Sequence, residues 1–112
     1  MITVITKYPN QPVTTKEIDG SLEAMQKIVG GYIELVGIEI GDNYYSLVCN
    51  EEGKLQNLEP NIILKSDFAG FGARDIVAGP VFVMKHDEEG EAISLGADDI
   101  MPIVNYLNER AF

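Results

Sequence analysis

The alternation of apolar and polar residues changes period along the chain, and the changes mark the expected elements. Residues 2–8 alternate with period two and are rich in β-branched side chains, which predicts a strand, and residues 13–18 are expected to form a second one. The Pro9–Pro12 segment between them is a turn signal, so the two strands are expected to form a hairpin. A short amphipathic helix follows, and its apolar face consists of Leu22, Met25, Ile28 and Val29.

Both ends of this helix carry recognisable signals. Asp19 or Ser21 can accept hydrogen bonds from the free amides of the first turn. Gly30 suits the left-handed conformation that ends a helix, and Gly31 allows the chain to leave sharply. Because the helix is short, it must pack on a sheet to persist.

Further apolar runs predict strands at 32–40, 44–49, 76–85 and 91–95. Gly41–Asn43 and His86–Gly90 are hairpin turns between them. Asn50–Lys54 is a tight polar turn in which Gly53 is expected to adopt a positive φ. Gly79–Pro80 interrupts the run at 76–85 and indicates a sheet edge or a bulge there.

Two stretches have no strict period. Residues 55–64 are expected to form an irregular or briefly helical crossing, and residues 65–75 a loop with Gly70–Gly72 at its tip. A second helix is expected to begin near Asp98 and Asp99, with Pro102 tolerated only in its first turn. Its apolar face consists of Ile100, Ile103, Val104 and Leu107.

These elements predict one domain over residues 1–112. We expect an α+β fold, in which about two helices pack on a small, mostly antiparallel or mixed sheet of about six strands. A chain of this length can bury one real core.

The charge of the chain limits the partners it can have. Eighteen acidic residues against eight basic ones give a net charge of −10. Such a surface repels phosphate backbones and anionic membranes, so direct nucleic-acid binding and membrane binding are disfavoured. It permits basic protein partners. Acidity also keeps a small protein in solution, and this second explanation is the simpler one.

The sequence also suggests a compartment. No window holds the long uncharged apolar run of a membrane span, and Met1–Lys7 lacks the features of a signal peptide. The single Cys49 excludes an internal disulfide and fits a reducing cytoplasm. A cytoplasmic location is therefore expected.

The residues that could carry out chemistry are few. Cys49 lies in an apolar strand and His86 opens an acidic turn, so no nucleophile–base pair is expected, and we expect no enzyme activity. The acidic turn lacks the alternating ligands of a calcium loop, and one His with one Cys cannot build a zinc site. We expect neither a metal nor a cofactor.

Two groups of residues are candidates for binding. Phe71 and Arg74 lie in a glycine-containing loop that could hold an anionic ligand through stacking and a guanidinium fork. Tyr32, Asn50 and Asn61 are polar residues near strand ends. The simpler interpretation is that an aromatic side chain fixes the loop to the core and that the asparagines satisfy turn backbone. A candidate protein-binding surface consists of the acidic residues Glu51, Glu52, Asp87, Glu88, Glu89 and Glu91.

The order of several motifs resembles a known family. These motifs are the segment Ile18–Glu34, then Val48–Leu55, then Leu58–Asn61 and then Asp75–Gly79. Together they resemble an uncharacterised domain-of-unknown-function family of Gram-positive bacteria, their phages and their mobile elements. Members often carry a basic residue after the Pro-Asn pair, where this chain has Ile62. The resemblance implies a cytoplasmic accessory protein of a phage or mobile element and implies no catalytic residues.

Three functions remain open at this stage. The first is a binding protein that presents carboxylates to a basic host protein, for instance in an anti-defence role. The second is sequestration of a small anionic ligand such as a nucleotide, in a pocket or between subunits. The third is a structural or homo-oligomerisation module, suggested by the apolar residues of the Tyr106–Phe112 stretch.

Overall fold

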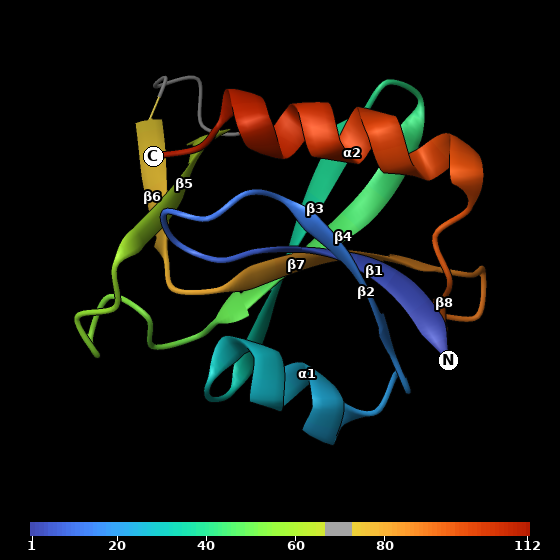
Figure 1. Ribbon diagram of the computed structural model, residues 1–112, viewed down its shortest axis with the longest axis horizontal. Coiled ribbons are helices and arrows are strands. Elements are labelled where there is room, and N and C mark those ends of the chain that lie inside the picture. The colour runs from blue at the N-terminus through green and yellow to red at the C-terminus, as the bar shows by residue number, and fades with distance from the viewer. Residues whose placement is uncertain (67–72) are drawn as a thin grey trace.

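The computed structural model describes residues 1–66 and 73–112 and contains one main antiparallel sheet with a helix on each face (Figure 1). The strands of the main sheet are β1 (Ile2–Lys7), β2 (Thr14–Ile18), β3 (Ile33–Ile40), β4 (Asn43–Asn50), β7 (Val81–His86) and β8 (Ala92–Ile93). The helices are α1 (Leu22–Val29) and α2 (Ala97–Glu109). A second, two-stranded sheet consists of β5 (Pro60–Ser66) and β6 (Ala73–Ala78). The predicted α+β class is confirmed.

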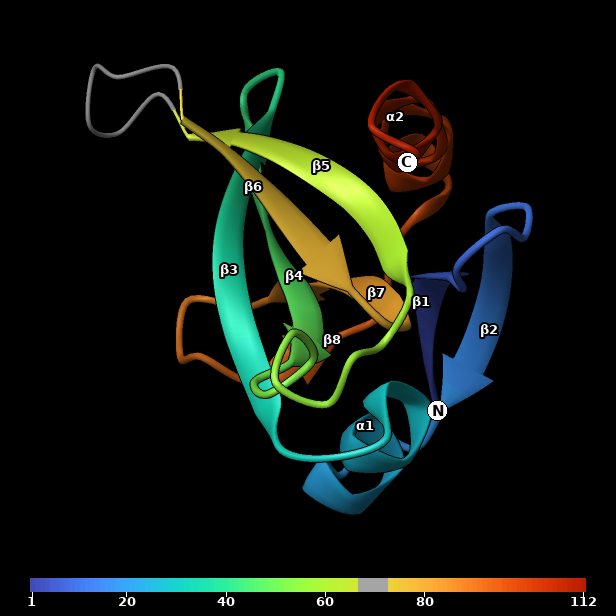
Figure 2. The same cartoon turned by 90° about the vertical axis from the view of Figure 1, so that its left-hand side faces the viewer.

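The main sheet has the order β2-β1-β7-β4-β3, and β8 extends it beside the end of β7. Helix α1 covers one face, and α2 covers the other face together with β5 and β6 (Figure 2). Since side chains alternate between faces along each strand, the core has two halves. Phe82, Val48 and Val4 pack beneath α1, whereas Val83, Leu47 and Ile5 pack beneath α2.

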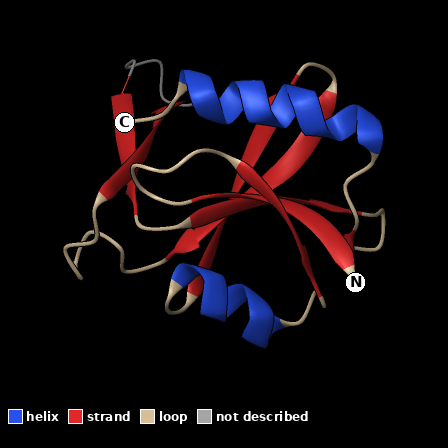
Figure 3. Cartoon of the chain, in the orientation of Figure 1, coloured by secondary structure: helices blue, strands red, loops and turns tan. Residues whose placement is uncertain are grey.

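Helix α1, drawn between two loops in Figure 3, has its ends at the positions that the sequence predicts. The Oγ of Ser21 accepts a hydrogen bond from the amide of Ala24 at 3.1 Å, and Asp19 in turn accepts one from the amide of Ser21. Gly30 adopts the left-handed conformation with φ of 78°. Of the predicted apolar face, Met25, Ile28 and Val29 are buried, but Leu22, at the first position of the helix, is 57% exposed.

The second half of the chain departs most from the sequence prediction. Residues 60–66 form strand β5 and not an irregular or helical crossing, and β6 begins at Ala73 inside the predicted loop. The expected single strand at 76–85 is two strands, β6 and β7, which belong to different sheets. Gly79 and Pro80 mark the passage between the sheets, and the irregular pairing lies instead between Pro60 and Ile62. The predicted strand at 91–95 is reduced to Ala92–Ile93.

Three smaller expectations are also wrong. Asn57, and not Gly53, has the positive φ in the turn after β4. Gly53 is required by space, because a Cβ there would lie 2.6 Å from the carbonyl oxygen of Ala78. Strand β3 begins at Ile33, so Tyr32 precedes it. Pro102 lies beyond the first turn of α2, where it is tolerated on the exposed side of the helix.

The C-terminal residues pair with strand β5 of the small sheet. Ala111 forms a bridge with Ile62, and the amide of Phe112 donates to the carbonyl of Asn61 at 2.9 Å. Leu107 is fully buried in the core of its own chain, so it is not available to cover a neighbouring subunit. Neither of the two described helices has the length and hydropathy needed to cross a membrane.

Gly79 connects the two sheets, and its replacement by alanine is expected to lower the free energy of unfolding by about 2–3 kcal/mol. Its φ is 87°, and a Cβ there would lie 2.6 Å from Cδ1 of Leu58. Gly30→Ala is the matched control, since Gly30 has φ of 78° but open space around a Cβ. The free energy of unfolding of this control variant should fall by only about 1 kcal/mol. Urea unfolding of both variants checks this, and equal losses would show that Leu58 moves aside freely.

Candidate functional site

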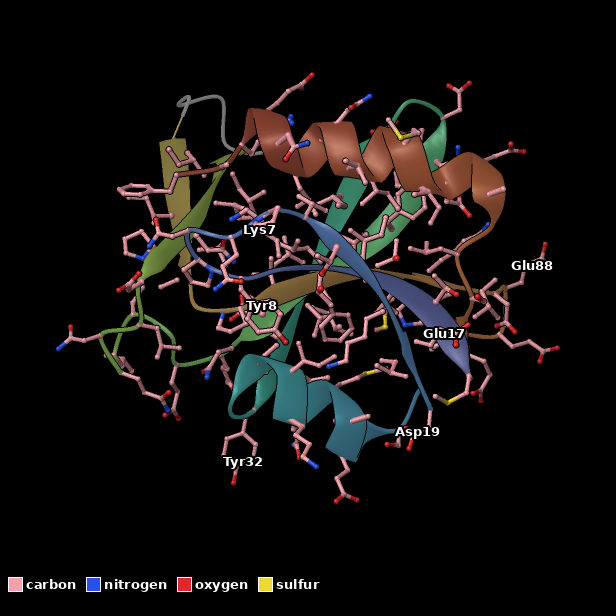
Figure 4. All side chains as sticks on the ribbon, in the orientation of Figure 1. Lys7, Tyr8, Glu17, Asp19, Tyr32 and Glu88 are labelled. Atoms are coloured by element: carbon pink, nitrogen blue, oxygen red, sulfur yellow. The ribbon has the colours of Figure 1, made fainter. Side chains whose placement is uncertain are left out.

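A groove of about 450 Å³ opens where α1 ends and the turn after β4 passes beside it. Tyr32 follows the end of α1 and is 69% exposed, and Figure 4 shows its side chain projecting beyond the helix. The groove brings together side chains from the helix and the turn, which are far apart in the sequence. The lining residues are Glu23, Gln26, Lys27, Gly31, Tyr32, Asn50, Glu52 and Gln56.

Asn50 holds the two walls of the groove together. Its Nδ2 donates to the carbonyl oxygen of Val29 at 3.1 Å and to Oε1 of Gln56 at 3.4 Å. Its Oδ1 accepts from the amide of Glu52 at 2.8 Å. A Cβ at position 31 would lie 2.9 Å from Nδ2 of Asn50, so Gly31 permits this close approach. The amide of Asn50 therefore fixes the shape of the groove, and its hydrogen-bonding capacity is largely used within the protein.

The charges around the groove favour a cation over an anion. Glu23 and Glu52 contribute two carboxylates, and Lys27 contributes one ammonium group. The C-terminal end of α1 adds the partial negative charge of the helix dipole. The exposed ring of Tyr32 can contact a guanidinium or ammonium group through its face. The neighbouring carboxylates can accept hydrogen bonds from the same cationic group. This arrangement suits an arginine or lysine side chain of another molecule.

A second polar cluster lies inside the protein, where β5 meets β1. Asn61 is 1% exposed, and its Nδ2 donates to the carbonyl oxygens of Lys7 at 2.7 Å and Gly79 at 2.9 Å. The Nζ of Lys7 donates to Oδ1 of Asn61 at 3.1 Å and to the carbonyl of Tyr8 at 2.8 Å. Burial lowers the pKa of Lys7 below its usual value. Asn61 therefore joins the two sheets and does not reach the groove.

A third cluster attaches α2 to the sheet. The hydroxyl of Tyr45 donates to Oδ1 of Asp99 at 2.6 Å, and the amide of Gly96 and Nζ of Lys85 both contact Oδ2, at 2.7 and 3.3 Å. Burial by itself raises the pKa of Asp99, but the hydrogen bonds from Tyr45, Gly96 and Lys85 outweigh it, and the pKa is lowered. Burial, followed by the neighbouring carboxylate, raises the pKa of Tyr45 to about 12. This cluster is a buried connection between α2 and β4.

The acidic residues predicted as one protein-binding surface lie in two separate places. Glu51 and Glu52 follow β4, where Glu52 but not Glu51 lines the groove. Asp87–Glu91 form the turn between β7 and β8 on the other side of the molecule (Figures 1 and 4). Asp87 also organises its own turn, because its Oδ1 accepts from the amides of Glu89 and Glu91, both at 2.9 Å. Of these residues, Glu52 lines the groove together with the exposed ring of Tyr32.

The remaining candidates take no part in the groove. Phe71 lies outside the described residues, as does the side chain of Arg74. Cys49 is buried, with its Sγ 3.8 Å from the carbonyl of Glu34. His86 contacts the hydroxyl of Ser46, which lies on the opposite face of β4 from Cys49, so these two residues do not form a pair. Within residues 1–66 and 73–112, no group of His, Cys, Asp and Glu is arranged to hold a metal ion.

Sequence reasoning missed several groove residues and one buried lysine. Helical spacing places Glu23, Gln26 and Lys27 on one polar face of α1, so their proximity could have been predicted from the period of the helix. Alternation in the first strand also places Lys7 on the same face as Ile5, which indicates a buried lysine. Nothing in the sequence indicated that Gln56 would meet the end of α1.

The family model described as "Domain of unknown function (DUF3846)" matches residues 2–108. The chain belongs to the DUF3846 family. The resemblance to an uncharacterised domain family is thereby confirmed, and the match covers every helix and strand of the fold except the last residue of α2. No curated protein and no solved structure matches the chain. For this DUF3846 member, function is therefore inferred from the geometry of the groove.

Proposed function

We propose that this protein is a non-enzymatic accessory protein that binds a basic segment of a partner protein in the groove at the end of α1. The observation that carries the proposal is the convergence of Tyr32, Glu23 and Glu52 around one cavity. An exposed aromatic ring flanked by carboxylates is complementary to arginine and lysine side chains. The net charge of −10 would accelerate the encounter with such a partner.

The resemblance of the sequence motifs to proteins of phages and mobile elements supports a host protein as the partner. A protein that binds nucleic acid is the best match in chemistry, because its basic groove is adapted to phosphates and accepts carboxylates in their place. If this protein covers the nucleic-acid-binding groove of the host protein, the host protein is blocked. This is the anti-defence role in its simplest form. The protein would act in the cytoplasm, where such partners occur.

Sequestration of an anionic ligand has less support. The groove contains two carboxylates against the single ammonium of Lys27, so a nucleotide would meet net repulsion there. Asn61, one of the residues proposed for such a site, is buried against Lys7 and Gly79. The described residues therefore favour a cationic occupant.

A capped hexa-arginine peptide titrated into isotopically labelled protein tests the proposal. The backbone amide signals of the groove residues should shift first, and the affinity should fall as salt is added. Tyr32→Ala and Glu52→Gln should each weaken binding about two- to five-fold, since exposed cation–π and charge pairs contribute about 0.5–1 kcal/mol each.

Glu88→Gln is the matched control, because it removes the same charge from the exposed turn on the other side of the molecule. It should weaken binding less than about 1.5-fold, as expected for a screened distant charge. Equal effects of Glu88→Gln and Glu52→Gln would mean that peptide binding depends only on net charge. The proposal that the groove is the binding site would then be wrong.

A further inference from the structure

Strand β3 forms one edge of the main sheet, and no described strand pairs with its outer side (Figure 2). It has eight residues, and its register with β4 continues without a break from Ile33 to Ile40. Edge strands are usually protected from further pairing by shortness, lysine, proline or a bulge. The opposite edge, β2, is short, exposed and contains Lys16, whereas β3 is long, regular and free of lysine and proline, and its charged side chains are those of Glu34 and Glu39.

The direction of the β3 backbone groups follows from the hairpin. The amide of Glu51 donates to the carbonyl of Tyr32 at 2.9 Å, so these two residues form a hydrogen-bonded pair. Hydrogen-bonded pairs alternate along an antiparallel ladder, which assigns the inward groups to residues 34, 36, 38 and 40. The N–H and C=O groups that point outward, away from β4, are therefore those of Ile33, Leu35, Gly37 and Glu39.

The side chains near this edge leave apolar surface exposed on both faces. Leu35 is 51% exposed on the α1 side, and next to it a Cβ at Gly37 would meet nothing within 4 Å. On the other face, a hollow lined by Val36, Leu64 and Ile76 among others opens along the same strand. The edge thus offers a large side chain next to an open position on the same face.

We propose that this chain forms a two-fold symmetric dimer in which β3 pairs antiparallel with β3 of a second copy, with Val36 on the symmetry axis. In this register Leu35 faces Gly37 of the partner subunit, and Ile33 faces Glu39 of the partner subunit. Each outward N–H and C=O group of these residues then finds a partner. The two main sheets become one continuous sheet.

Self-complementarity is the reason to choose a second copy as the occupant. The exposed Leu35 covers the open position at Gly37 of the partner subunit, and the symmetry repeats this contact. Glu34 faces Ile38 of the partner subunit, so no two carboxylates lie directly opposite, which would be destabilising. An axis at Glu34 would place two carboxylates together, and an axis at Gly37 would place Ile33 against the Gly41 turn.

Crosslinking and sedimentation test the dimer and its register. Val36→Cys should form an intermolecular disulfide under mild oxidation, because opposed residues of a non-hydrogen-bonded pair lie close enough for one. Glu39→Cys is the control, since its copies would be six residues apart in register. Crosslinking of Val36→Cys no faster than that of Glu39→Cys would overturn the proposal.

Wild-type protein should sediment as a dimer, and salt should strengthen the association by screening the repulsion between two chains of net charge −10. Leu35→Glu, which adds charge to the edge, and Gly37→Pro, which removes an outward donor, should each raise the dissociation constant at least about tenfold. Tyr44→Glu is the control, because Tyr44 is 74% exposed on the adjacent strand. A wild-type monomer at millimolar concentration in high salt, or dimers unaffected by both edge variants, would refute the interface.

Discussion

Asn61→Ala is expected to lower the free energy of unfolding by about 4 kcal/mol. The asparagine is 1% exposed, and its amide satisfies the carbonyls of Lys7 and Gly79 and the ammonium of Lys7. Alanine would remove the donor to both buried carbonyls and would leave the ammonium with only the carbonyl of Tyr8, and each buried group that loses its partner costs about 1–3 kcal/mol. Urea unfolding of the variant and wild type at neutral pH measures the difference.

Asn105→Ala provides the comparison, since Asn105 is exposed on α2 and alanine favours the helix. That variant should change stability by less than about 0.5 kcal/mol. A loss below about 1 kcal/mol for Asn61→Ala would show that water replaces the amide. The connection between the two sheets would then not depend on the side chain of Asn61.

Tyr45→Phe is expected to lower the free energy of unfolding at pH 7 by about 2 kcal/mol, because it removes a buried hydrogen bond to the charged Asp99. The loss should depend on pH in one direction. The pKa of Tyr45 is raised from 10.0 to about 12 in the folded protein. Its contribution is therefore complete below pH 10 and is lost as the pH rises through 12.

The difference between wild type and Tyr45→Phe should shrink by about 1.4 kcal/mol between pH 7 and pH 11, since only the wild type loses this contribution. Burial also raises the pKa of Tyr106, although Arg110 opposes the rise, but this group is present in both proteins and cancels. Urea unfolding at several pH values measures the two curves. A constant difference from pH 7 to pH 11 would mean that Tyr45 does not titrate as a buried phenol.

The first half of the fold could be predicted from sequence because its signals are local. Ser21 and Gly30 determine the ends of α1 through hydrogen bonds and backbone conformation within a few residues. The β3–β4 hairpin depends on a two-residue turn between two periodic runs. Each of these signals is contained in a window of the chain that can be read without knowing its neighbours.

Strands β5 and β6 could not be predicted because their environment is set by distant parts of the chain. Ile62 is fully buried and Ile63 and Leu64 are half-buried, so the run shows no period of two. Asn61 is buried beside them only because Lys7 and Gly79 offer partners for its amide. A polar residue next to a proline resembles a turn until those partners are known.

The same limit applied to the candidate site. Tyr32 and Asn50 were predicted as binding residues and do line one groove, but Asn50 mainly supports its shape. Glu52 was predicted as part of an acidic surface, and it lines the groove together with Glu23 because α1 lies beside the turn. Which polar residues converge on a cavity is a property of packing between elements, and the periods of single elements do not contain it.

Each of the two buried polar clusters joins a pair of residues 54 positions apart in the sequence. The pairs are Lys7 with Asn61 and Tyr45 with Asp99. A long loop must close before either contact can form. The chain therefore loses conformational entropy before the contacts can offset that free-energy cost. Folding should therefore be slow for a domain of this size and limited by assembly of distant segments, while α1 and the hairpins form early. The polar contacts that stabilise the finished protein would then contribute little to the speed at which it forms.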